Sequence, residues 1–194
     1  GSPEDAIESF RQLAALDPAN ILAHRDLALA WERQGNAQLH AGKSDAALAS
    51  YRQLLQTARD WVQRDPANPY ANQMLAVAEM KMAEALPHTG DRDGAVIAAR
   101  SAIHALDSLI ANEKDNPLFL RDRALAQWVL GRALIELATA AKEQAPWQDA
   151  EAQLRRARDM FNELASRNQL SGEDLAAPKA IADQIETCRQ ALNK

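Results

Sequence analysis

The chain has 194 residues, a net charge of −5 and a single cysteine, Cys188. An acidic chain without clustered Lys and Arg lacks the surface that nucleic-acid binding requires, and one cysteine excludes an internal disulfide framework. Hydrophobic residues make up 47% of the chain but aromatic residues only 5%, and Gly and Pro are few. This composition is typical of closely packed helices. No apolar run approaches the roughly 20 residues of a membrane span, so we expect no membrane insertion.

Two punctuation motifs divide the chain at nearly equal intervals. Asp17-Pro18-Ala19-Asn20 returns 48 residues later as Asp65-Pro66-Ala67-Asn68, and Asp115-Asn116-Pro117 follows after 50 more. A fixed period of this size is the signature of stacked helical repeats. The sequence therefore predicts an all-α fold, an α-solenoid of antiparallel helix hairpins with about seven to eight helices, including a C-terminal capping helix.

The first element is a single helix over residues 3–17, with Ala6, Phe10 and Leu13 on one face. We interpret it as the second helix of a hairpin whose first helix is missing. Gly1-Ser2 resembles an expression scar. The chain then begins inside a helical pattern, so we expect it to be a piece of a longer protein.

The first complete unit covers residues 20–65. A helix is predicted from Asn20 or Ile21 to about Leu39, and a second helix, capped by Asp45, to about Arg64. The second helix carries a wide apolar stripe, which consists of Ala47, Leu48, Tyr51, Leu54, Leu55, Ala58 and Val62.

The second unit covers residues 69–114 and repeats this pattern. A helix is predicted from Pro69 to about Leu86, followed by a turn at His88–Asp91. The apolar stripe of the next helix lies 48 positions after the first one, at Ala95, Val96, Ala99, Ala102, Ile103, Leu106 and Ile110.

The third unit covers residues 117–168, and Gly131 lies 96 positions after Gly35. We expect its turn, around Glu143–Pro146, to be longer by about one helical turn. The last segment, residues 171–194, is predicted to be the capping helix. Ser171 and Asp174 would form a capping box, and the apolar face would consist of Ile181, Ile185, Cys188 and Leu192.

These units resemble a tetratricopeptide (TPR) array, whose signature is W-x2-L-G-x2-Y followed by A-x3-F-x2-A. The matching residues are Ala6, Phe10, Leu13 and Pro18, then Trp31, Gly35, Ala47 and Tyr51, then Leu130, Gly131, Ala150, Leu154 and Ala157. The period departs from the usual 34 residues, and about 14 extra residues would lengthen each helix by about two turns. The resemblance implies a module that binds proteins or peptides.

A finer resemblance rests on Arg25-Asp26-Leu27-Ala28 and the Asp-Pro-Ala-Asn punctuation. Both are similar to long-helix repeat arrays in the C-terminal regions of bacterial serine/threonine protein kinases. The resemblance implies a sensor or regulatory region in bacterial signalling. It leaves the compartment open, either periplasmic, following a membrane helix, or cytoplasmic.

No motif indicates catalysis. The four histidines, His24, His40, His88 and His104, form no spaced zinc pattern, and we expect them to be solvated or capping. Cys188 continues an apolar stripe and is expected to be a buried small hydrophobe. No phosphate-binding loop or nucleophile elbow is present in the sequence. We therefore interpret the chain as non-enzymatic, with no metal and no cofactor.

A partner would bind along the first helices, which line the concave side in the TPR family. Residues at i, i+7 and i+11 share one face of a helix. Applying this spacing to each first helix gives nine groove candidates, which are Arg25, Glu32, Asn36, Gln73, Met80, Glu84, Arg121, Trp128 and Arg132. Trp128 has two interpretations, as packing beneath the third unit or as an anchor flanked by Arg121 and Arg132.

Three functional hypotheses remain open. The first is a protein- or peptide-binding module. The second is a small-molecule receptor whose pocket Met80 and Trp128 could line. The third is a structural spacer or homodimer contact. All three predict a chain that works by binding or packing.

Overall fold

The computed structural model describes residues 3–17 and 20–193 and confirms the all-α fold. In the described residues every regular element is a helix. The α-helices are α1 Pro3–Leu16, α2 Ile21–His40, α3 Ser44–Arg64, α4 Pro69–Ala85, α5 Arg92–Asn112, α6 Pro117–Ala141, α7 Gln144–Ser166 and α8 Ala177–Leu192, with short 3-10 helices η1 Leu86–Thr89 and η2 Gly172–Ala176.

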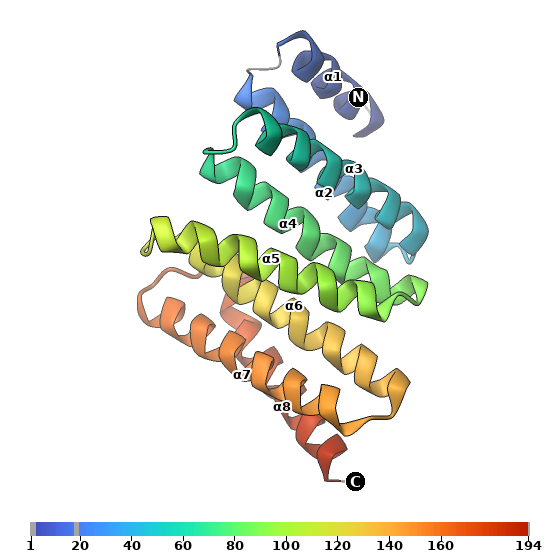
Figure 1. The fold of residues 1–194 in the computed structure, drawn as a ribbon, viewed down its shortest axis with the longest axis vertical. Coiled ribbons are helices and arrows are strands. Elements are labelled where there is room, and N and C mark those ends of the chain that lie inside the picture. The colour runs from blue at the N-terminus through green and yellow to red at the C-terminus, as the bar shows by residue number, and fades with distance from the viewer. Residues whose placement is uncertain (1–2, 18–19, 194) are drawn as a thin grey trace.

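The helices stack in chain order along the long axis of the molecule (Figure 1). Each α-helix packs against the next one in the chain, and α4 also contacts α2 and α6. In Figure 1, α2, α6 and α8 lie behind α3, α5 and α7. The complete pairs are α2–α3, α4–α5 and α6–α7, and we call their members the first and second helices. By its position relative to the repeat, α1 is a second helix and α8 a first helix.

Asparagine side chains begin the first helices. Asn20 Oδ1 accepts a hydrogen bond from the backbone N–H of Ala23 (3.0 Å), Asn68 Oδ1 from that of Tyr70 (3.0 Å), and Asn116 Oδ1 from that of Leu118 (3.1 Å). These bonds satisfy N–H groups that have no partner within the helix. They explain physically why an asparagine, either at the end of Asp-Pro-Ala-Asn or within Asp115-Asn116-Pro117, marks the start of each new unit.

Three local predictions are wrong. Helix α3 begins at Ser44, so Asp45 lies in its first turn and does not cap it. Ser171 precedes η2 without a side-chain cap, because Asp174 instead binds Arg121. The third turn is not longer either. Gln144 already opens α7, and the extra residues lengthen α6 to 25 residues and α7 to 23.

Within each hairpin, a small residue on the first helix lies opposite a side chain of matched size on the second. A Cβ atom added at Gly35 would lie 2.3 Å from Tyr51 Cε1, and one added at Gly131 would lie 2.6 Å from Leu154 Cδ2. The corresponding positions of the middle unit hold Ala83 and Ala99, both buried. In each hairpin the two helices therefore pack through side chains of complementary volume, although the residue types at these positions differ between units.

Candidate functional site

The nine groove candidates lie on α2, α4 and α6, and the structure links most of them in a network across units. Gln73 Nε2 donates to Asp122 Oδ2 (2.6 Å), and Arg132 Nη2 donates to Glu84 Oε1 (2.7 Å). These bonds join α4 to α6. Arg121 continues the network to the end segment through Asp174, with 2.5 Å between Nε and Oδ2. Side chains expected to face a partner thus also hold neighbouring units together.

The prediction for Met80 is wrong. Its side chain is 5% exposed and belongs to the main hydrophobic core. Its equivalents in the other two units, Glu32 and Trp128, are both half-buried. This position therefore lies between packed helices, where an apolar side chain such as Met80 joins the hydrophobic core.

Trp128 packs as a structural residue. Its ring meets Phe161 edge-on, with 6.1 Å between centroids, and its Nε1 donates to Gln184 Oε1 of α8 (2.7 Å). The guanidinium of Arg132 lies over the ring, 5.5 Å from its centroid. The structure thus places Trp128 beneath the third unit and brings Arg132, but not Arg121, against it.

The first unit contributes less to the network that links the units. Among the described residues, Arg25 forms an ion pair with its neighbour Asp26 (2.9 Å), at an exposed position. Asn36 Oδ1 accepts a hydrogen bond from Tyr51 Oη (2.8 Å). Burial raises the pKa of Tyr51, so its phenol remains protonated and can donate this bond.

Charged groups on α2 and α4 interact closely. Burial raises the pKa of Glu32, and the charge of Lys81 opposes that rise. Burial acts in the same direction on Glu84, but Lys81 and Arg132 outweigh it and hold the pKa of Glu84 below its usual value. Glu84 is therefore ionised and lies between two cations, Lys81 and Arg132. Lys81 was missed by the sequence analysis, although its i, i+3 spacing to Glu84 is typical of a helical ion pair.

A small hollow of about 260 Å³ lies beside this network, between α4, η1 and α6. Arg132 lines it together with Glu84, His88 and Glu136. The Arg132 side chain is 43% exposed, yet its Nε is buried and has no hydrogen-bond partner in the described structure. Arg132 thus keeps a donor unused while its Nη2 binds Glu84.

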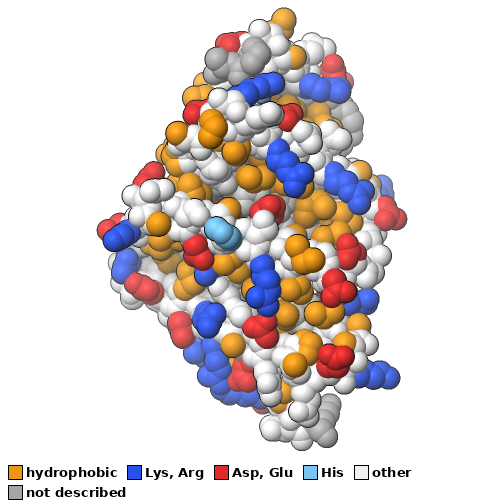
Figure 2. Space-filling view, viewed as in Figure 1, with side chains coloured by type: hydrophobic (Ala, Val, Ile, Leu, Met, Phe, Trp, Pro, Cys, Tyr) orange, Lys and Arg blue, Asp and Glu red, His pale blue; other side chains and the backbone are white. Residues whose placement is uncertain are grey.

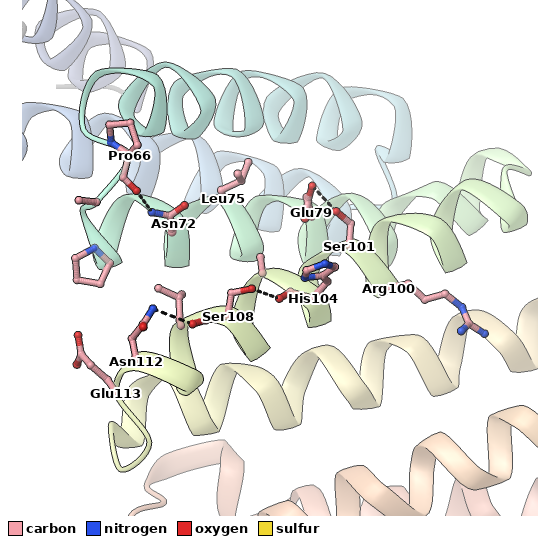
Figure 3. Close-up of a pocket in the computed structure, with 14 residues that line it drawn as sticks. Pro66, Asn72, Leu75, Glu79, Arg100, Ser101, His104, Ser108, Asn112 and Glu113 are labelled. Atoms are coloured by element: carbon pink, nitrogen blue, oxygen red, sulfur yellow. Dashed lines mark hydrogen bonds between the residues drawn. The ribbon is translucent and has the colours of Figure 1, made fainter.

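A larger hollow, of about 980 Å³, lies elsewhere and was not predicted (Figure 3). Asn72, Leu75 and Glu79 of α4 line it, facing Ser101 and His104 of α5. Ser101 Oγ donates to Glu79 Oε1 (2.8 Å), and burial raises the pKa of Glu79. Other polar groups there bind local backbone. For example, Asn72 Nδ2 donates to the carbonyl of Pro66 (2.9 Å). This hollow is an interhelical groove without an activated nucleophile.

His24 differs from expectation. It is 5% exposed rather than solvated, its Nε2 lies 2.9 Å from Arg64 Nη1, and its ring stacks on Trp61. Residues 40 positions apart make this contact, so spacing alone could not reveal it. Across the described residues, no three His, Cys, Asp or Glu side chains are grouped to hold a metal ion.

The surface carries charge of both signs. On the face formed by α3, α5 and α7, Lys and Arg lie among Asp and Glu, with apolar side chains scattered between them (Figure 2). Among the described helices, α5 alone is long and apolar enough to cross a membrane. Because α5 also packs between α4 and α6, this property does not indicate insertion either way.

No protein-family model matches the chain, and no curated protein matches it either.

Proposed function

We propose that the chain is a non-catalytic helical-repeat module that binds a protein or peptide along the face of its first helices. The observation that carries this proposal is the Arg132 guanidinium. It is partly exposed beside a hollow, and Glu84 and the Trp128 ring hold it in place. A fixed guanidinium recognises a carboxylate with little loss of conformational entropy.

The hollow beside Arg132 favours a peptide over a small molecule. Its volume of about 260 Å³ lies below the roughly 300–1,000 Å³ typical of small-molecule sites. Met80, one of the two residues expected to line a ligand pocket, is buried in the core. An acidic side chain of a peptide could reach Arg132 while the rest of the peptide lies across α4 and α6.

The biological setting is a separate proposal. The Arg-Asp-Leu-Ala motif and the repeat punctuation support a TPR-like array in the regulatory region of a bacterial serine/threonine kinase. This part rests on the motifs alone.

Charge reversal at two matched arginines tests the binding face. Arg132 pairs with Glu84 on the first-helix side, and Arg100 of α5 pairs with Asp149 (2.7 Å) on the second-helix side. We expect an affinity-captured partner to be recovered with the wild-type chain and with Arg100→Glu, but not with Arg132→Glu. Equal recovery with both variants would show that the partner binds elsewhere.

A further inference from the structure

Another hollow, of about 660 Å³, lies on the second-helix side of the stack, between α5 and α7. Helix α6 lies behind these two helices (Figure 1), and its buried residues Gln127 and Leu130 form the floor. The hollow beside Arg132 is a different one, because it lies between α4, η1 and α6.

A chain of hydrogen bonds holds two arginines at this hollow. Arg123 Nη1 donates to Gln127 Oε1, and Gln127 Nε2 donates to Gln153 Oε1. Gln153 Nε2 donates to Asp149 Oδ1 (2.5 Å), and Asp149 Oδ2 accepts from Arg100 Nη2 (2.7 Å). The two glutamines are 2% and 8% exposed. Buried amides thus connect both guanidinium groups, which limits their freedom to move before any ligand binds.

The repeat does not require an arginine at position 123. The equivalent residues, 96 and 48 positions earlier in the chain, are Leu27 of α2 and Leu75 of α4. Leu27 is 7% exposed, and Leu75 packs against the main hydrophobic core. Because the other two hairpins form with leucine here, Arg123 adds a charge that the hairpin fold does not need.

Arg156 brings a third guanidinium to the hollow, from an exposed position of α7. Among the described residues, no ion pair or hydrogen bond engages its side chain. When the second helices are aligned on their contacts with the small residues of the first helices, its equivalents are the uncharged Gln53 and Ser101. Arg156 is therefore a cation specific to the third unit that is free to bind a ligand.

The charge of the hollow is opposite in sign to that of the whole chain. Arg100, Arg123 and Arg156 supply three positive charges. Asp149, paired with Arg100, and Asp107, paired with Arg123 (2.6 Å), supply two negative charges and leave a balance of +1. The whole chain has a net charge of −5. The hollow is thus a local site of attraction for an anion.

The size and the lining of the hollow indicate the kind of anion. A volume of about 660 Å³ lies within the roughly 300–1,000 Å³ typical of small-molecule sites. Guanidinium groups match the oxygens of a phosphate with paired hydrogen bonds, and Ile103 and Leu130 add an apolar surface beside them. We propose that the hollow between α5 and α7 binds a small phosphate ester, with its phosphate against Arg123 and Arg156 and its apolar part against Ile103 and Leu130.

Phenyl phosphate is a suitable probe, because it joins a phosphate to an apolar ring. The 194-residue chain is titrated with it by isothermal calorimetry. We expect saturable binding with a Kd of about 1 mM or tighter, and competition by inorganic phosphate. Benzyl alcohol, which has the ring but no phosphate, should not compete.

Arginine substitutions locate the site. Arg156→Gln should weaken binding roughly tenfold, because it removes the guanidinium that has no partner in the protein. The matched control is Arg158→Gln on the same helix, since Arg158 pairs with Asp159 (2.9 Å) and does not line the hollow. It changes the net charge equally and should leave the affinity unchanged. Arg132→Gln should also leave it unchanged, which separates this site from the proposed peptide face.

A second variant uses the residue that the repeat itself supplies. Arg123→Leu installs the leucine of the other two units, so the chain should stay helical by circular dichroism. Binding of phenyl phosphate should nevertheless weaken at least tenfold, because one of the two guanidinium groups that face the phosphate is lost.

Three results would overturn the proposal. The first is no saturable binding of phenyl phosphate up to about 10 mM by the folded chain. The second is equal weakening by Arg156→Gln and Arg158→Gln, which would mean only a diffuse attraction of anions to the surface. The third is a short phosphotyrosine peptide that binds more than about tenfold more tightly than phenyl phosphate, which would assign the hollow to a phosphorylated protein segment.

Discussion

The two ends of the stack are built differently. At the C-terminal end, α8 buries Ala177, Ile181, Ile185 and Cys188 against the preceding helices and presents polar residues outward. At the N-terminal end, α1 leaves Leu13 and Phe10 partly uncovered. A helical stack needs a polar outer face wherever it stops. The C-terminal end meets this requirement, whereas the N-terminal end has the surface of an interior unit.

Two equivalent phenylalanines should show the largest difference between the ends. Phe161 is fully buried and contacts Trp128, so Phe161→Ala should lower the free energy of unfolding by about 3–5 kcal/mol. Changing Phe10, its half-buried counterpart on α1, to Ala should lower the free energy of unfolding by only about 1 kcal/mol. Urea denaturation measures both. Equal losses would mean that α1 is as well covered as α7.

The reactivity of cysteine thiols gives a second comparison of how well the two ends of the stack are covered. Burial raises the pKa of Cys188 to about 11, so only about one thiol in a thousand is ionised at pH 8. A cysteine introduced by Ala37→Cys, at an exposed position of α2, should react with an aromatic disulfide more than about a hundredfold faster. In urea, both thiols should react at similar rates. Fast labelling of the wild-type chain in native buffer would contradict a closed C-terminal end.

Glycine substitutions test whether the incomplete cover of α1 makes the neighbouring α2–α3 hairpin less tightly packed than the α6–α7 hairpin. Gly35→Ala and Gly131→Ala each force a Cβ into a buried side chain, and we expect overpacking to cost about 1–3 kcal/mol, partly offset by roughly 1 kcal/mol of helix propensity. Ala83→Gly is the control and should cost roughly 1 kcal/mol. If Gly35→Ala alone is tolerated, the open end extends beyond α1.

The smallest expected effect concerns the tether of the C-terminal cap. Asp174 holds Arg121, whose side chain is 38% exposed, so Asp174→Asn should cost at most about 1 kcal/mol. Amide exchange in α8 should accelerate while exchange in α1 stays unchanged. Faster exchange throughout the chain would instead show that the two ends unfold together.

Much of the fold could be predicted because its signals are local. Asn20, Asn68 and Asn116 begin helices through side-chain contacts within three residues, and the recurring apolar stripes mark the second helices. Long-range contacts could not be predicted this way. Arg121 meets Asp174 across 53 positions, and His24 meets Arg64 across 40. The local pattern at Ser171 predicted a cap, but the ion pair to Arg121 engages Asp174 instead.

The candidate site was predicted less well for a related reason. Helical spacing shows which residues share a face, but not how closely the next helix approaches. Met80 lies in the main core together with Ala78 and Ala126, whereas the Arg132 side chain remains 43% exposed. The incomplete cover of α1 emerges only when the exposure of Leu13 is compared with that of its equivalents, Trp61 and Leu109.

Packing limited to neighbours along the chain has a mechanical consequence. In the described residues, the main contacts of each helix are with the next one or two helices, so tension applied between the termini passes along the stack from unit to unit. The contact between α1 and α2 should break first, because Leu13 and Phe10 of α1 are partly exposed to solvent. Helix α1 should then separate while α4 to α8 stay assembled.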